Sequence, residues 1–254
     1  MRLVDGAESI RGDLPTVGTV TVDVPLGAGN DNGTTVQRLS ALLSVRDAQL
    51  VALDAIAGLT ITIGGDCGVD LASIEHAASV NDGVAVIWLD AHPDLNTPES
   101  SPSDAFHGMV LRTLLGDGPA TLTPAVLLAP SKVILGGTRA LDDAEQEFVE
   151  SAGIRMIPPD ELDAASITAA LAASGATSVY LHIDLDVLDP AEFTGIGYPE
   201  PFGVTLAILL EVIAAAKAAL PLVGAAVTEF APASPEAAAD DLGSILRIIG
   251  ALAS

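Results

Sequence analysis

The chain has 254 residues, half of them apolar, and a formal net charge of −24 with only two lysines, Lys132 and Lys217. This length suffices for one large core, and no linker rich in proline, glycine or serine divides the sequence, so we expect a single domain over residues 1–254. The acidic balance argues against nucleic acid, which needs a basic footprint; it is compatible with a cationic small substrate or simply with an acidic, soluble surface.

Apolar runs alternate with helical patterns along the chain. In chain order, strands are predicted over residues 17–25, 59–63, 84–89, 132–136, 154–157, 178–183 and 222–228. Helices are predicted over about 34–57, 70–80, 107–116, 142–152, 161–174, 205–219 and 240–252, and residues 90–106 are predicted to form a long loop. This alternation predicts right-handed βαβ units and therefore an α/β fold, with a mainly parallel sheet covered by helices on both faces.

Acidic side chains follow four of the predicted strands at the point where each strand ends. They are Asp66, Asp90, Asp94, Asp184, Asp186 and Glu229, with Cys67 and His92 among them. The carboxyl ends of parallel strands meet at one edge of a sheet, where ligands bind in α/β folds. So many carboxylates at one edge, without lysine or arginine, would repel one another unless a cation held them. The sequence therefore predicts a metal centre.

The spacing of these residues supports that prediction. Asp90, His92 and Asp94 alternate, so their side chains point to the same side of an extended segment, and Asp184 and Asp186 repeat this spacing. Imidazole with carboxylate suits manganese, iron, cobalt or zinc, and two such ions can share an activated water. Taken singly, each residue is explained as a helix cap, a turn or a core histidine, and Asp189 before Pro190 is interpreted as a turn former.

Four segments together resemble the ureohydrolases, the arginase/agmatinase family of binuclear manganese amidinohydrolases. They are Gly64-Gly65-Asp66, Asp90-Ala91-His92-Pro93-Asp94, His107-Gly108 and Asp184-Leu185-Asp186-Val187-Leu188-Asp189-Pro190. The resemblance keeps the same order from about Gly64 to Pro232. It implies a three-layer α/β/α arginase-like fold and hydrolysis of a guanidino group, in L-arginine or a related compound, to urea and an amine by a metal-bridging hydroxide.

The resemblance also implies roles for individual residues. Glu229 matches the glutamate that pairs with the guanidinium group, and His107 matches the histidine proposed as proton shuttle; a surface salt bridge and a helix N-terminal residue are the structural alternatives. Asp90 and Asp184 would be shared between the two ions. Carried over by position, the metal ligands would be Cys67, Asp90, His92, Asp94, Asp184 and Asp186.

Cys67 departs from the family, which usually has histidine at this position. A thiolate is a softer ligand than imidazole and binds metals at about 2.3 Å. We therefore expect two divalent ions, manganese first, with zinc, iron or cobalt as alternatives because of Cys67. The other outcomes are a weakly held first ion, a non-catalytic protein of the same fold, or Cys67 as a small buried apolar residue.

The substrate-binding residues are a second point of departure. By resemblance, Asn96 and Ser103 would hold an α-carboxylate, and Asp142 and Glu145 would meet an α-amino group, although Asp142 is equally explained as a helix N-cap. Ala105 and Tyr198 stand where arginases have a polar residue and a small threonine. An agmatinase, guanidinobutyrase or formiminoglutamase activity is therefore the alternative to arginine hydrolysis, and a deacetylase on a related fold is a weaker one.

Only a few features of the sequence bear on the cellular compartment and the partners of the protein. Cys67 is the only cysteine, which excludes an intrachain disulfide and fits a reducing compartment. The first residues lack the apolar core of a signal peptide, and charged residues break every apolar stretch before the roughly 20 residues that a membrane span needs. We expect a soluble cytoplasmic protein without a membrane partner and, by family resemblance, a homo-oligomer, either a trimer or a hexamer.

Overall fold

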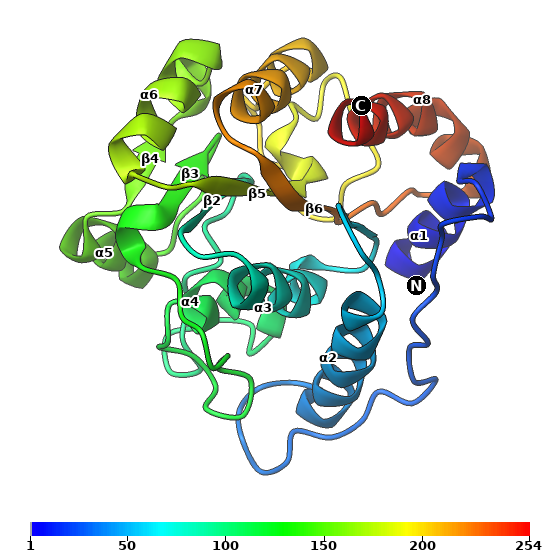
Figure 1. Ribbon diagram of the computed structural model, residues 1–254. Helices are drawn as coiled ribbons and strands as arrows, with labels where there is room; N and C mark the ends of the chain where they lie inside the picture. The colour runs from blue at the N-terminus through cyan, green and yellow to red at the C-terminus, as the bar shows by residue number, and fades with distance from the viewer. Residues whose placement is uncertain (1) are drawn as a thin grey trace.

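The computed structural model describes residues 2–254 and is built on a six-stranded sheet in which every neighbouring pair of strands is parallel (Figure 1). The strand order is β1-β6-β5-β2-β3-β4. The strands are β1 (Ile61–Ile63), β2 (Val84–Leu89), β3 (Val133–Gly136), β4 (Arg155–Ile157), β5 (Ser178–Asp184) and β6 (Leu222–Thr228).

Helices cover both faces of this sheet, which makes three layers (Figure 1). One core lies between the sheet and α1 (Arg2–Asp13), α6 (Ala164–Ser174), α7 (Leu206–Ala219) and α8 (Pro235–Ala253). The other core lies between the sheet and α2 (Leu39–Asp54), α3 (Asp70–Val80), α4 (Val110–Leu114) and α5 (Asp143–Ala152). The predicted three-layer α/β fold with a mainly parallel sheet is thus confirmed.

The central strands are continuous apolar runs because both of their faces are covered. Every residue of β2 is buried, and its side chains alternate between the two cores: Ala85, Ile87 and Leu89 join one, and Val84, Val86 and Trp88 join the other. This is the pattern of a strand inside a parallel sheet, where hydrogen bonding on both edges and apolar packing on both faces leave no polar position.

The strand order determines where the site forms. β1, β6, β5 and β2 are consecutive neighbours, so their carboxyl ends lie side by side, and these are the strands that the acidic segments follow. A short 3-10 turn, Leu185–Val187, begins directly after β5, another, Cys67–Val69, begins a few residues after β1, and a long loop follows β2. The sheet therefore brings together four segments that are far apart in the sequence, as seen from the contact between Cys67 and Thr228, 161 positions apart.

Two sequence predictions at the amino-terminal end are wrong. Residues 17–25 form no strand; Val17, Val20 and Val24 are 90%, 58% and 67% exposed, and the sheet within residues 2–254 ends at β1 without pairing to this segment. The β-branched residues indicated a strand, but a strand needs a partner and a covered face. Conversely, α1 was not predicted, because its sequence is mostly polar and buries only Gly6 and Ile10.

The remaining elements agree within a few residues. α2 begins at Leu39 rather than near residue 34, and α8 begins at Pro235 rather than at 240. Ser234 is the N-cap of α8 and accepts a hydrogen bond from the Ala237 amide. Across residues 2–254, the structure contains no helix with the length and apolar character required to cross a bilayer.

Candidate metal centre

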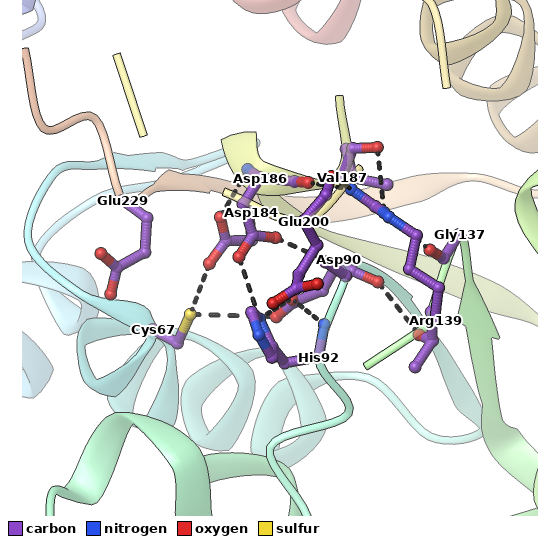
Figure 2. Close-up of polar contacts among 12 residues, drawn as sticks. Cys67, Asp90, His92, Gly137, Arg139, Asp184, Asp186, Val187, Glu200 and Glu229 are labelled. Carbon is purple, nitrogen blue, oxygen red and sulfur yellow. Dashed lines mark hydrogen bonds and ion pairs between the residues drawn. The ribbon is translucent and has the colours of Figure 1, made fainter. Parts of the chain in front are cut away.

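The donor side chains come from the carboxyl ends of three strands, β1, β2 and β5, and face one another. Cys67 opens the turn after β1, which Asp66 caps by accepting a hydrogen bond from the Gly68 amide at 2.9 Å. Asp90 follows β2, and Asp184 is the last residue of β5. Figure 2 shows Cys67, Asp90, His92 and Asp184 pointing toward a common centre, with Glu229 on one side and Arg139 on the other.

The first group of donor atoms contains the cysteine. Cys67, Asp90, His182 and Asp184 each offer a ligand atom, and these four atoms lie within 4.8 Å of one another. The Cys67 thiol donates to Asp184 Oδ2 at 3.1 Å and lies 4.0 Å from Asp90 Oδ2, while His182 Nε2 lies 3.7 Å from the same Asp90 oxygen. All four residues are buried, so the group is a compact polar island in the core.

The second group consists of Asp90, His92 and Asp186, again with ligand atoms within 4.8 Å of one another. His92 Nδ1 lies 2.9 Å from Asp186 Oδ2 and 3.6 Å from Asp90 Oδ1. Asp90 therefore turns one oxygen toward each group. A carboxylate placed between two groups of donors is the arrangement that bridges two cations about 3.5–4 Å apart.

Backbone amides fix the orientation of these carboxylates. The Asp186 amide donates to Asp184 Oδ1 at 2.8 Å, and the Ala91 amide donates to Asp186 Oδ1 at 3.0 Å. The His92 amide donates to Asp90 Oδ1 at 2.6 Å. Each carboxylate thus keeps one oxygen on the backbone and turns the other oxygen, or its remaining lone pairs, toward the donor groups.

Arg139 holds the far side of the site. Its guanidinium donates to the carbonyl oxygens of Asp186 and Glu200, both at 2.8 Å, and of Gly137 at 3.0 Å (Figure 2). One side chain therefore ties the loop after β3 to two points of the segment after β5. Because it binds carbonyls rather than the Asp186 carboxylate, it leaves that carboxylate free for a cation.

Asp94 belongs to neither group, although it was predicted as a ligand. Its backbone has φ = 51°, in the left-handed region that non-glycine residues rarely adopt, and it is 4% exposed. Within residues 2–254, Asp94 Oδ2 has no hydrogen-bond partner. A strained, buried carboxylate with an unpaired oxygen is costly unless it meets a cation or a ligand.

The crowding of acidic groups also raises the pKa of several of them. Burial raises the pKa of the Cys67 thiol, and the charges of Asp94 and Asp184 raise it further. Burial and then the neighbouring Asp90 raise the pKa of Asp186 to about 6. Burial, followed by the charges of Asp66 and Asp186, raises the pKa of Glu229 to about 9. Without a cation, these acids hold protons that they would otherwise release.

The imidazoles of His92 and His182 interact with these carboxylates. Burial alone would lower the pKa of His92, but its contacts with Asp186 and Asp90 raise it to about 11. Burial alone would raise the pKa of Asp90, but the nearby imidazoles of His182 and His92 lower it below the ordinary value. Positive charge is thus the missing component of this site, and protonated imidazole supplies it in part.

These residues fit divalent metal ions. The donors are a thiol, imidazoles and carboxylates, which together suit transition metals rather than calcium or magnesium. Asp94 Oδ2 and His182 Nε2 are buried side-chain atoms without hydrogen-bond partners in the part of the chain that the structure describes. Metal binding would satisfy such atoms and relieve the repulsion among the acids.

The two predicted catalytic groups lie together beside the donors. His107 Nδ1 is 3.8 Å from Glu229 Oε1, an atom that is buried and has no hydrogen-bond partner within residues 2–254. Glu229 also has a left-handed backbone, with φ = 63°. The Tyr198 ring is 57% exposed and stacks on the His107 ring, with centroids 5.4 Å apart, and its edge approaches His92.

The four predicted substrate-binding residues differ from one another in burial and in hydrogen bonding. Asn96 is buried; its amide donates to Asp142 Oδ2 at 2.9 Å, and its oxygen accepts from the Ser100 hydroxyl at 2.8 Å. Glu145 is also buried, and its two oxygens accept hydrogen bonds from the Leu95 and Asp142 amides. Asp142 is exposed and serves as N-cap of α5 in a capping box with Glu145, and Ser103 is exposed in the loop.

His182 was not predicted as a site residue. It lies inside the apolar strand β5, where a single histidine is interpreted as a core residue. One signal was present: His182, Asp184 and Asp186 repeat the alternating spacing of Asp90, His92 and Asp94.

Comparisons with known proteins agree with this geometry. A sequence model of the Arginase family matches residues 13–245. The chain is similar to the arginase of Bacillus caldovelox, with 29% identity over 80% of this chain and 72% of that protein. It is also similar to the N(omega)-hydroxy-L-arginine amidinohydrolase of Streptomyces lavendulae, with 33% identity over 84% of this chain and 76% of that protein.

Further matches include two sequence relatives that are covered over a smaller share of their length and one solved structure. Those to the arginases of Bacillus subtilis and Staphylococcus aureus span about half the length of these relatives. The fold is similar to that of Entamoeba histolytica arginase, solved in complex with L-ornithine, with a TM-score of 0.87, 24% identity, and coverage of 99% of this chain and 92% of that one.

Proposed function

Because this chain belongs to the arginase family of metal-dependent ureohydrolases, we propose that it hydrolyses the guanidino group of L-arginine or a close relative to urea and an amine. The observation that carries the proposal is the pair of donor groups sharing Asp90, next to the buried Glu229 and the partly exposed His107. The first provides a place for cations, and the second provides a carboxylate and a proton donor for a cationic substrate.

The predicted ligands would hold two divalent ions, of which we propose manganese first, with zinc, iron or cobalt as alternatives because of Cys67. When bound, such ions activate a water molecule at neutral pH and stabilise negative charge that develops on oxygen. The rest of the chemistry falls to the side chains around them.

Glu229 would bind and orient the substrate guanidinium. Its Oε1 is buried and unpaired within residues 2–254, and burial and neighbouring acids raise its pKa to about 9. A guanidinium group donates to a carboxylate through parallel hydrogen bonds and brings the positive charge that Glu229 lacks. Binding the substrate would therefore ionise Glu229 and fix the guanidinium plane at the same time.

His107 would donate the proton that the leaving amine requires. Its ring lies between Glu229 and Tyr198, so both its position and its plane are restrained. An imidazole can donate a proton from one ring nitrogen and take one up from water, which suits a proton shuttle to the leaving amine. Its partial exposure leaves a route to water.

Asp142, with Asn96 behind it, would receive the α-amino group of an amino-acid substrate. Asp142 is exposed, and the Asn96 amide holds one of its oxygens. The second candidate function is hydrolysis of a guanidino compound without that group, such as agmatine or 4-guanidinobutyrate. It is favoured by Glu145, whose two oxygens are already occupied by backbone amides, and by the bulk of Tyr198.

We also propose a cytoplasmic location and a homo-oligomer. The support is the family resemblance together with the single cysteine, Cys67, which fits a reducing compartment. Light scattering coupled to size-exclusion chromatography of the purified protein would give the mass of the particle, and a monomer would contradict the second proposal.

The test is urea release by purified protein after loading with manganese, cobalt, iron or zinc, with metal content measured on the same samples. L-arginine, N-hydroxy-L-arginine, agmatine and 4-guanidinobutyrate are compared as substrates. Urea from any of them, abolished by Asp186→Ala, supports an amidinohydrolase, and the preferred substrate decides between the two candidates. Two bound ions without urea from any substrate would contradict the proposed reaction.

A further inference from the structure

His182 is held in one orientation inside the core. It is 0% exposed, and Nδ1 lies 2.7 Å from Asp70 Oδ2, while the other Asp70 oxygen accepts a hydrogen bond from the Tyr180 hydroxyl. On the neighbouring strand, Trp88 pairs with His182 in register and stacks on it, with centroids 3.5 Å apart and 10° between the rings. Asp70 therefore places the proton on Nδ1 and leaves the Nε2 lone pair on the opposite side of the ring.

That lone pair points into the group of donors around Cys67. His182 Nε2 is buried, has no hydrogen-bond partner within residues 2–254, and lies 3.7 Å from Asp90 Oδ2. This separation is too long for a good hydrogen bond. It is close to the separation of about 3.4 Å expected between two donors of one tetrahedral ion bound at about 2.0–2.2 Å.

We propose that His182 is a ligand of the metal ion that Cys67 binds, so that this ion is held by Cys67, Asp90, His182 and Asp184. The inference rests on the metal centre of the proposed function and changes its ligand set, because β5 supplies an imidazole where Asp94 was predicted. Asp70 and Tyr180 are positioning residues, which set the tautomer and the plane of the ring from behind.

This ligand set has a consequence for the metal. One thiolate, one imidazole and two carboxylates make a four-donor set of the kind that zinc and cobalt occupy in tetrahedral geometry. Manganese prefers oxygen donors and gains less from sulfur. With this ligand set the Cys67 ion is better suited to zinc or cobalt than to manganese, while the group of Asp90, His92 and Asp186, without sulfur, still suits manganese.

The competing interpretation is that His182 is a core histidine. Its contacts with Asp70 and Trp88 are explained equally well by that role. The unpaired Nε2 is not, because a buried nitrogen without a hydrogen-bond partner destabilises the fold. X-ray absorption spectroscopy distinguishes the two interpretations, since it identifies the atoms bound to zinc without any need for turnover.

The experiment uses His92→Gln protein loaded with one equivalent of zinc, so that His92 cannot contribute an imidazole signal. We expect one sulfur at about 2.3 Å together with the multiple-scattering signature of a single imidazole. In the protein that carries both His92→Gln and His182→Gln, the imidazole signature is lost and the sulfur remains. Circular dichroism confirms that each variant is folded.

A second readout uses the single variants. His182→Gln weakens one of the two zinc ions by at least about tenfold in competition with a chelator, and in cobalt-loaded protein it alters the visible bands typical of four-coordinate cobalt. His92→Gln, the matched control, weakens the other ion and leaves the sulfur-to-cobalt charge-transfer band in place.

Zinc bound by sulfur without imidazole in the His92→Gln protein overturns the inference, as does zinc that is not bound by sulfur. Neither result depends on urea release. A sulfur-and-imidazole site in a protein that hydrolyses no guanidino compound would support this ligand set and contradict the proposed function, while urea release without the imidazole signature would do the reverse.

Discussion

Glu229 illustrates how one residue combines local strain and chemistry. Its backbone adopts φ = 63°, and its amide donates to the Gly65 carbonyl at 3.0 Å, so the turn after β6 is tied to the turn after β1. Gly65 itself has φ = 71°, and a side chain there would meet Val69. The left-handed backbone at Glu229 costs of order 1–3 kcal/mol, which the surrounding structure must offset.

Replacing Glu229 by glutamine therefore removes the charge and keeps the shape. We expect Glu229→Gln to lower kcat/KM for the preferred guanidino substrate by at least about tenfold, because a neutral amide cannot pair with a guanidinium ion. The fold and the metal content should stay the same. Urea release measured over a range of substrate concentrations gives the effect.

The matched control is Glu192→Gln, a glutamate that is exposed in the segment after β5. It removes the same charge from the molecule without touching the site. Equal losses in the two variants would show that net charge, rather than the position of Glu229, governs the reaction.

Most donors of the site could be predicted from the sequence because they stand directly after apolar strands. Cys67, Asp90, His92, Asp184 and Asp186 all come together as expected. His182 was missed despite its alternating spacing with Asp184 and Asp186, since its proposed role depends on Asp70 and Cys67, two residues that only the sheet brings near. The roles of all these residues in metal binding, catalysis and substrate binding stay predictions.

At the scale of elements, burial decided which predictions succeeded. The strand β2 begins and ends where its apolar run predicts, because both faces of the strand are covered and every residue in it is buried. The segment 17–25 contains equally good strand formers but has no partner. α1 shows the opposite case, in which one narrow strip of contacts holds a mostly polar helix against α8.

Gly6 is the point at which α1 packs against the segment that follows β6. A Cβ atom at this position would lie 2.0 Å from the Phe230 carbonyl oxygen, which belongs to the residue after Glu229. We expect Gly6→Ala to lower the free energy of unfolding by about 1–3 kcal/mol, because the helix and the Phe230 backbone must separate. Urea-induced unfolding followed by circular dichroism measures this change.

Gly12 in the same helix provides the control, since a Cβ atom there would meet nothing within 4 Å. Gly12→Ala should raise stability by about 0.5–1 kcal/mol through helix propensity alone. If both substitutions stabilise the protein, α1 does not pack closely against Phe230.

Asp142 has two roles to distinguish: it is the N-cap of α5 and a predicted substrate contact. A comparison with Asp163, an N-cap without a predicted substrate contact, separates the two. Asp142 begins α5 in a capping box with Glu145, and Asp163 begins α6 in a capping box with Ser166. We expect Asp142→Ala and Asp163→Ala to lower the melting temperature to a similar extent. Only Asp142→Ala should raise KM for L-arginine, and it should spare a substrate without an α-amino group.

Melting curves and urea release on both variants, with L-arginine and 4-guanidinobutyrate, provide the comparison. Equal effects of the two substitutions on arginine turnover would mean that Asp142 acts only as a cap. A loss of turnover with both substrates in Asp142→Ala alone would place its effect on the metal centre through Asn96 instead.

For the whole molecule, the sheet order places acidic side chains close together at one edge of the sheet, and folding alone does not remove their mutual repulsion. The sheet order gathers buried acids from the ends of β2, β5 and β6, in a chain whose formal net charge is already −24. Burial and mutual repulsion raise the pKa of Asp94, Asp184, Asp186 and Glu229. Folding without metal therefore takes up protons, and folding with metal releases them.

The stability of the metal-free protein should consequently fall as pH rises. For Glu229 the pKa rises from 4.5 to about 9 on folding, and for Asp186 from 3.8 to about 6, so the folded state binds more protons than the unfolded state between these values. His92 acts in the same direction: its pKa rises from 6.5 to about 11, and the stability that it contributes is fully present below 6.5 and is lost as pH rises toward 11. Each difference in bound protons gives the unfolding free energy a negative slope with pH.

Chemical unfolding of metal-free protein between about pH 5 and pH 9 tests this sign, with metal-loaded protein as the comparison. Bound cations replace the protons, so the metal-loaded protein should show a flatter profile in this window and a higher free energy of unfolding, by about 4 kcal/mol when free metal is 1,000 times its Kd. A metal-free protein that gains stability with pH, or identical profiles with and without metal, would mean that the buried acids are neutralised within the chain and that no cation completes the site.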